Sequence, residues 1–271
     1  MIRYSITLLL FVFQIFVAKA TTLSIVSWNL FDFGKTKSDE EILTICKLVK
    51  DFDIVAIQEV VALDPGGAQA VARMADQLNR MGAKWDYSIS NPTNCEGKFK
   101  ERYAFIWKTS KVKKRGENFF DTSFEEEIKR EPFLGRFQTN NKEFLLMNFH
   151  AISKNAASEV EYIPTIISKY PNDRLIIAAD FNVADSHPTM KSIYSMGFSP
   201  ALINQKTTLK ETLGDNGDYL FASKDNIVVM DDYFEIVESG IINIMKHLGD
   251  LNTARNISDH VGIWVKVTFK E

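Results

Sequence analysis

Short apolar runs of four to eight residues recur along the chain, and several of them end in a small polar cluster. They alternate with longer stretches that carry the apolar spacing of helices, which is typical of an α/β protein. Such proteins build their sites at the ends of buried strands. The pattern therefore predicts an α/β domain with one polar site. The clusters are Ser27–Asn29, Ile57–Glu59, Lys100–Tyr103, Asn148–His150, Ala179–Asn182 and Ser258–His260.

The same runs place the main elements. Predicted strands, which are rich in β-branched and aromatic residues, are Thr22–Ser27, Ile54–Gln58, Tyr103–Lys108, Phe144–Phe149, Leu175–Ala179, Ile227–Met230 and Val261–Phe269. Ser38 and Glu41 form a capping box that opens a helix to about Asp51. Further helices are predicted over Ala68–Met81 and within Ala156–Lys169, which Pro164 interrupts. With no repeat or linker, residues 21–271 are interpreted as a single domain.

Residues 1–20 have the pattern of a cleaved signal peptide. Arg3 leads into the apolar run Ile6–Val17, and Ala18-Lys19-Ala20 matches the small-x-small pattern of a cleavage site. The run is too short to span a bilayer comfortably, so no retained membrane anchor is expected. We expect export to the periplasm or the medium.

Charge limits the classes of function. Without Arg3 and Lys19, 30 basic residues face 35 acidic ones, which gives a net charge of −5. A tight, stoichiometric nucleic-acid binder is usually basic, because phosphate contacts dominate its affinity. The composition argues against such a binder, but it leaves room for an enzyme that touches few phosphates and holds a cation.

The chain holds two cysteines, Cys46 and Cys95. Export would permit a disulfide between them. Cys46 lies on the apolar stripe of the first predicted helix, where a buried free thiol is the simpler interpretation.

Carboxylates and carboxamides end several predicted strands. Glu59 follows the apolar run Ile54–Ile57, where an unpaired charge at the edge of the core is costly. A divalent cation would offset that cost, because hard cations such as Mg²⁺ prefer oxygen ligands. Asn29 offers another oxygen in a similar place. Asp180 and Asn182 follow another buried run, although such residues are also common turn formers.

Two of the four histidines lie at strand ends. His150 closes one predicted strand, and His260 precedes another, directly after Asp259. A lone histidine in such a place is usually a packed structural residue. Two of them beside carboxylate-bearing strand ends favour acid/base chemistry. His187 and His247 have no such setting and are interpreted as structural or surface residues.

Motifs of other enzyme classes are absent from the sequence: it has no Gly-rich phosphate loop, zinc signature or nucleophile elbow. From Leu23 to Phe269 the ordered clusters resemble the endonuclease/exonuclease/phosphatase family, and within it the secreted DNase I-like branch. That resemblance implies an α/β (α+β) fold, a four-layer α/β/β/α sandwich of two packed sheets flanked by helices. The segments most specific to it are Lys100–Tyr103, Arg130–Pro132, Asp180–Asn182, Asp225–Val229 and Ser258–His260.

The resemblance also implies roles for single residues. It implies two catalytic pairs, His150 with Glu101 and His260 with Asp225. The implied metal side consists of Glu59 as the principal Mg²⁺ ligand, with Mn²⁺ or Ca²⁺ as alternatives, and of Asn29 and Asp259. The residues implied to handle the attacking water and the phosphate are Asp180 and Asn182, and Arg130 is implied to grip the DNA backbone.

Some positions depart from the branch. Phe31 and Val61 stand where it typically carries arginines, and Phe99 stands where a groove-contacting tyrosine is usual. Ala179 replaces the glycine usual before Asp180, and the branch's cysteine pair near Asp225 is missing. These changes put the preference for duplex DNA in doubt, but they leave the hydrolytic set complete.

Three candidate functions are compatible with these features. The leading hypothesis is a secreted, divalent-metal-dependent endonuclease that hydrolyses DNA with little sequence preference, acting as a monomer without a stable protein partner. The alternative is a sphingomyelinase-like enzyme or another small-substrate phosphodiesterase or phosphatase, for which Phe119–Phe120 and Phe124 are candidates for an exposed membrane-inserting hairpin. A catalytically dead binding module is the third, and the complete set of site residues argues against it.

Overall fold

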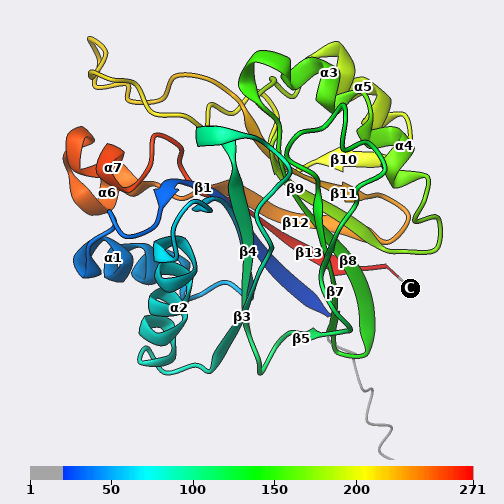
Figure 1. The fold of residues 1–271 in the computed structure, drawn as a ribbon, viewed down its shortest axis with the longest axis horizontal. Helices are drawn as coiled ribbons and strands as arrows, with labels where there is room; N and C mark the ends of the chain where they lie inside the picture. The colour runs from blue at the N-terminus through cyan, green and yellow to red at the C-terminus, as the bar shows by residue number, and fades with distance from the viewer. Residues whose placement is uncertain (1–20, 271) are drawn as a thin grey trace, which may run out of the picture.

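The computed structural model describes residues 21–270, without the side chain of Lys98. The predicted signal peptide lies outside the described residues. Two β-sheets pack face to face, and helices cover their outer faces (Figure 1).

The six-stranded sheet has the order β12-β13-β1-β2-β4-β3, formed by β1 (Thr22–Phe33), β2 (Ile54–Val61), β3 (Trp85–Ile89), β4 (Glu101–Lys108), β12 (Phe234–Ile241) and β13 (Ile263–Phe269). The seven-stranded sheet has the order β10-β11-β9-β8-β7-β5, with β6 also pairing with β7. Its strands are β5 (Lys113–Lys114), β6 (Phe119–Phe120), β7 (Phe133–Thr139), β8 (Lys142–His150), β9 (Leu175–Asp180), β10 (Phe198–Pro200) and β11 (Asp225–Met230).

The helices divide between the two outer faces. Those that pack on the six-stranded sheet are α1 (Asp39–Val49), α2 (Gly66–Asn79), α6 (Ile244–Leu248) and α7 (Leu251–Ile257). Those that pack on the seven-stranded sheet are α3 (Ala156–Val160), α4 (Ile163–Ile167) and α5 (Pro188–Tyr194). Two short 3₁₀ helices, η1 (Gly97–Phe99) and η2 (Ser153–Asn155), lie in loops.

Three apolar cores separate these layers. One lies between the sheets and takes Leu23 and Ile25 from β1, whereas Val26 and Trp28 of the same strand face the helical core on the other side. A strand buried on both faces needs a nearly continuous apolar run, which is the pattern seen in its sequence. The third core lies between the seven-stranded sheet and its helices. The predicted four-layer α/β/β/α sandwich is confirmed.

The predicted elements are found, most of them with small shifts of their ends, although the first strand continues past Ser27 to Phe33. Ser38 and Glu41 form the expected capping box of α1. The region Ala156–Lys169 differs, because it forms two short helices, and Pro164 occupies the first turn of the second. Proline lacks the N–H needed inside a helix but fits its first turn, which explains the break.

Cys46 and Cys95 are both buried and free, so the structure contains no bridge between them. Within residues 21–270, the helices are all too short or too polar to cross a membrane.

Candidate active site

One row of side chains crosses the seven-stranded sheet at the end of three neighbouring strands. His150 on β8 pairs in register with Asp180 on β9, and Asp180 pairs in register with Asp225 on β11. Residues in one row of a sheet project from the same face. The register therefore places an imidazole and two carboxylates side by side, and all three residues are buried.

The six-stranded sheet contributes Asn29 from β1 and Glu59 from β2. The pairing of β2 with β4 shifts between Ile57 and Val60, and Glu59 has a left-handed backbone with φ of 59°. A non-glycine residue rarely adopts this conformation, and such strain is concentrated at functional sites. The irregularity places Glu59 beside Asn29, whose Nδ2 donates to Glu59 Oε1 at 2.9 Å.

Each histidine is held by a carboxylate from the opposite sheet. His150 Nδ1 lies 3.0 Å from Oε2 of Glu101, the first residue of β4. His260 lies before β13, and its Nδ1 is 2.9 Å from Oδ2 of Asp225. A carboxylate at Nδ1 fixes the tautomer and directs Nε2 toward the site. Both predicted pairs are formed, and each joins the two sheets.

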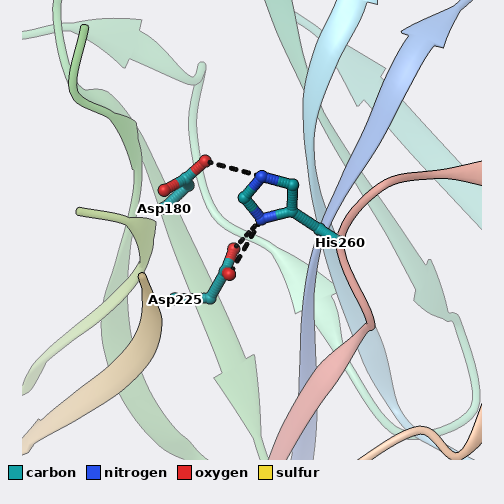
Figure 2. A group of neighbouring side chains, drawn as sticks. All are labelled: Asp180, Asp225 and His260. Carbon is teal, nitrogen blue, oxygen red and sulfur yellow. Dashed lines mark hydrogen bonds and ion pairs between the residues drawn. The ribbon is translucent and has the colours of Figure 1, made fainter. Parts of the chain in front are cut away.

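Asp180 lies between the two rings (Figure 2 shows it with His260 and Asp225). Its Oδ2 is 3.3 Å from Nε2 of His150 and 3.7 Å from Nε2 of His260, and it accepts a bond from Asn29 Nδ2 at 3.1 Å. Its Oδ1 accepts the backbone N–H of Asn182 at 2.9 Å. Asn182, with φ of 51°, is fixed in turn by a bond from its Nδ2 to the Ala151 carbonyl.

The charges of this cluster support one another. Burial would lower the pKa of His260, but Asp225 and Asp180 outweigh it and raise that pKa to about 10. Burial is likewise outweighed at His150, whose pKa is raised by Glu101 and Asp180. At Asp180, the two imidazoles overcome burial and keep the pKa below its usual value. The neighbours of each group therefore favour the charged form of the two rings and the anionic form of Asp180.

A metal ion has two candidate places. Among the described residues, Asp180, Asp225 and His260 form a buried group whose ligand atoms lie within 4.8 Å of one another, which is consistent with a metal site. A cation there would compete with the bond between Asp225 and His260. Glu59 offers the second place: burial raises the pKa of its carboxyl, a cost that a bound cation would remove.

At the second place, the carboxylate of Glu59 is an oxygen ligand of the kind that Mg²⁺ prefers. Asn29 turns its Nδ2 toward Glu59, and its Oδ1 accepts the backbone N–H of Phe31 at 3.1 Å. Asp259, half-buried, lines the same cavity as Glu59. The sequence-based assignment of Glu59, Asn29 and Asp259 to the metal stays a prediction, and the more tightly clustered group above does not contain these three residues.

Arg130 lies deeper than a surface contact with DNA requires. Its side chain is about 10% exposed, and its Nε is 3.1 Å from Oε2 of Glu101. Its Nη1 is 3.0 Å from both ring nitrogens of His150, so the guanidinium lies across that ring. Arg130 still lines the cavity, where a phosphate could reach it. Its role as a phosphate contact stays a prediction, and its visible role is to hold His150 and Glu101.

Sequence reasoning missed three supporting contacts. Thr207, fully buried, donates from Oγ1 to Asp225 Oδ2 at 2.6 Å. The hydroxyl of Tyr103 accepts the backbone N–H of His150. Asn148 bridges the sheets by donating to the carbonyls of Ile57 and Ala104. Tyr103 and Asn148 belong to polar clusters at the ends of predicted strands, although their contacts were not predicted. No local sequence pattern distinguishes Thr207.

The predicted bystander histidines are indeed outside the site. His187 caps α5 by accepting from the backbone N–H of Thr189, and His247 lies in the last turn of α6.

A cavity of about 450 Å³ opens over the centre and is lined by Glu59, His150, Asp180, Asn182 and His260 among others. Beside it, a second hollow is lined by Phe31, Leu63 and Phe99, which are exposed to 45%, 68% and 40%. Asp32 and Lys100 line the same hollow, so its rim combines exposed apolar side chains with charged ones.

The two-sheet sandwich holds two histidine–carboxylate couples at one end of its sheets, an arrangement suited to acid/base chemistry. No family model matches the chain. It is 28% identical to rat deoxyribonuclease-1 over 184 residues, which cover 63% of each protein, so the match spans just under two thirds of that relative. A deoxyribonuclease of Thioalkalivibrio is 24% identical over 270 residues, covering 92% of this chain and 72% of that one.

The fold agrees with these matches. An endonuclease/exonuclease/phosphatase family protein from Bacteroides thetaiotaomicron superposes with a TM-score of 0.67 at 18% identity, covering 93% of this chain and all of that one. The chain therefore has the fold of endonuclease/exonuclease/phosphatase proteins and is distantly similar in sequence to deoxyribonuclease-1.

Proposed function

We propose that this protein is a divalent-metal-dependent endonuclease that hydrolyses DNA phosphodiester bonds with little sequence preference. The observation that carries the proposal is the pair of buried histidine–carboxylate couples on either side of Asp180, beside the strained Glu59. The relatives reported above that carry the name deoxyribonuclease support DNA as the substrate.

The residues of the centre suit attack by water on a phosphodiester. His150 and His260 are held at Nδ1, so each presents Nε2 toward Asp180 and can pass or receive a proton there. Asp180 and Asn182 would orient the water and the phosphate. A metal at Glu59, when bound, would supply positive charge to the anionic phosphate oxygens. No covalent intermediate is required.

The kinds of side chain that line the site predict little sequence preference. The centre presents imidazoles, carboxylates and a buried guanidinium, which act on the phosphate and carry no information about the bases. The apolar residues at Phe31, Leu63 and Phe99 add no pattern of donors and acceptors for reading base edges.

A lipid phosphodiester is the alternative substrate. The aromatic residues considered for membrane insertion contact other rings of the protein. Phe120 lies edge-on to Tyr103 and tilted against Phe133, and the ring centroids of Phe124 and Tyr162 are 4.9 Å apart. Phe119 is 36% exposed, and Phe120 and Phe124 are half-buried. Rings that pack against the rest of the protein do not form an exposed hairpin for membrane insertion, so this observation favours DNA.

Export belongs to the same proposal. The pattern of residues 1–20 suits a signal peptide, and a nuclease that meets DNA outside the cytoplasm would need one. Cleavage after Ala20 is expected, and mass spectrometry of the N-terminus of the protein recovered from the periplasm or medium would test it.

The function is tested by incubating purified residues 21–271 with plasmid DNA, RNA and sphingomyelin, with Mg²⁺ and with EDTA. We expect nicking and then linearisation of the plasmid in Mg²⁺, and none in EDTA. Hydrolysis of sphingomyelin with the plasmid left intact would replace the proposal by the lipid alternative.

A further inference from the structure

A second cavity of about 510 Å³ adjoins the candidate active site. Lys224, Asp259 and His260 line both cavities, so the two form one continuous groove past the centre. Its outer part is formed by the loop that precedes β11 and by α7. In Figure 1 this loop, coloured yellow, projects from the sandwich above α6 and α7.

The wall of this groove is tied directly to the catalytic residues. Leu209 donates its N–H to the carbonyl of Asp259 at 2.7 Å, and Thr208 forms an isolated bridge with His260. The loop then folds back, where the N–H of Phe221 donates to the Thr208 carbonyl at 2.8 Å. A ligand in the groove would therefore be held at a fixed distance from His260.

The lining combines positive charge with one exposed ring. Phe221 lines the groove and is 66% exposed, whereas Leu209 at its base is 5% exposed. Lys224 stands at the junction with the active site. Arg255 lines the wall and uses Nη1 to hold the carbonyls of Leu209 and Lys210.

The charges along the groove are not uniform. Lys210 is 2.8 Å from Asp218, and Glu211 also lines the wall, so these two positions add little net charge. Two further cations line the groove and have no ion pair among those found within residues 21–270: Lys224 at the junction and Arg255 in the wall. Lys224 also interacts electrostatically with the buried Asp180. An anionic group is therefore favoured near the active site, and a flat apolar group further out at Phe221.

We propose that this groove holds an unpaired nucleotide next to the scissile phosphate, with its phosphate at Lys224 and its base on Phe221. The inference rests on the proposed function and extends it from DNA in general to single-stranded DNA as the preferred substrate. Bases in a duplex are paired and stacked and cannot reach an isolated ring, whereas unpaired bases stack on aromatic side chains without regard to sequence. The volume is within the range of pockets that hold ligands of this size.

The test compares kcat/KM of residues 21–271 on a single-stranded oligonucleotide, the same oligonucleotide in a duplex, and bis(4-nitrophenyl) phosphate, which carries no neighbouring nucleotide. Phe221→Ala is expected to lower the value for the single strand about tenfold, mainly through KM, the usual scale for one lost stacking contact. The duplex and the small diester should change less than twofold. Phe221→Trp should keep the preference for the single strand.

Leu213→Ala is the matched control, because Leu213 is exposed on the same loop but does not line the groove. It should leave all three substrates unchanged. If Phe221→Ala lowers kcat/KM equally on all three substrates, or on none of them, the inference is overturned. Cleavage of DNA by the wild type would still support the proposed function in that case. Turnover of the small diester with neither form of DNA cleaved would overturn both.

Discussion

The residues at the centre of the site are buried and fixed by several partners, whereas those at its rim are exposed. At the centre, His150, Asp180 and Asp225 are at most 3% exposed, and each is fixed by partners from two sheets. At the rim, Phe31 and Phe221 are exposed to 45% and 66% and lie on loops or at a strand end. The chemistry thus depends on the packed strands, while contacts with the substrate can change without disturbing them.

The difference between centre and rim also matches the positions at which the chain departs from the DNase I-like branch. Phe31 and Phe99 replace residues expected to contact DNA, yet the distances among the buried groups of the centre are those of intact pairs. Under the proposed function, the changed rim is expected to alter which nucleic acid is held and to leave the hydrolytic step in place.

The largest effect is expected from breaking the centre itself. His150→Ala and His260→Ala should each lower kcat by about a hundredfold or more, the usual scale for a lost acid or base. Because both act on one transition state, the double variant should lose far less than the product of the two. Initial rates on plasmid DNA from pH 5 to pH 8 measure this, and a single variant with full activity would make that histidine structural.

A smaller loss should follow when a residue behind the centre is changed. Thr207→Val keeps the shape but removes the hydroxyl that donates to Asp225, so the pair with His260 is held less firmly. We expect kcat to fall about tenfold with KM unchanged, as for other groups that orient a functional residue. Thr207→Ser, which keeps the hydroxyl, should restore the rate; if it is as slow as Thr207→Val, the methyl group and not the bond matters.

A substitution at the rim should change the affinity for DNA and leave the turnover rate unchanged. Phe31→Arg adds a cation at the edge of the hollow beside Glu59 and should tighten duplex binding a few-fold at low salt. The slope of log affinity against log salt should steepen by about 0.9 for one added phosphate contact. Phe31→Gln is the uncharged control. Binding measured in EDTA over a salt series reports both values, and equal slopes for the two variants would show that Phe31 lies away from the DNA.

The smallest effect concerns stability. The pKa of His260 is raised to about 10 in the folded chain, against about 6.5 when unfolded. The raised value stabilises the fold fully below pH 6.5, and this contribution is lost as the pH rises through 10. In EDTA, the free energy of unfolding of the wild type should therefore fall from pH 7 to pH 10 more steeply than that of His260→Asn. Parallel curves would contradict the charged state assigned to the ring.

The sequence predicted the buried framework well, because strands such as β1 and β9 are nearly continuous apolar runs with one structural solution. It did not predict β7 and β12. β7 contains Gly135, and β12 alternates charged and apolar residues and stays largely exposed, so neither gives the signal of a buried strand. The interruption of the helical region near Pro164 could be predicted from the chemistry of proline alone. The residues at which the two short helices end depend on packing and could not.

The site was predictable where a residue ends a strand and not where tertiary contacts decide. Glu59, His150 and Asp180 were found because polar residues after apolar runs are conspicuous. Thr207 lies 18 residues from Asp225, and only the fold brings them together. The burial of Arg130 beside Glu101 is likewise a product of packing between segments 29 residues apart.

The account is tested most directly by a Mg²⁺ titration of plasmid nicking by the wild type and Glu59→Gln. The substitution keeps the shape and the neighbours of the side chain but removes its negative charge, which is the property a cation needs. We expect the variant to fold normally, to nick about a hundredfold more slowly or worse at limiting Mg²⁺, and to need far more Mg²⁺ for half its maximal rate. The same rate and the same Mg²⁺ dependence as the wild type would contradict a metal-dependent centre at Glu59.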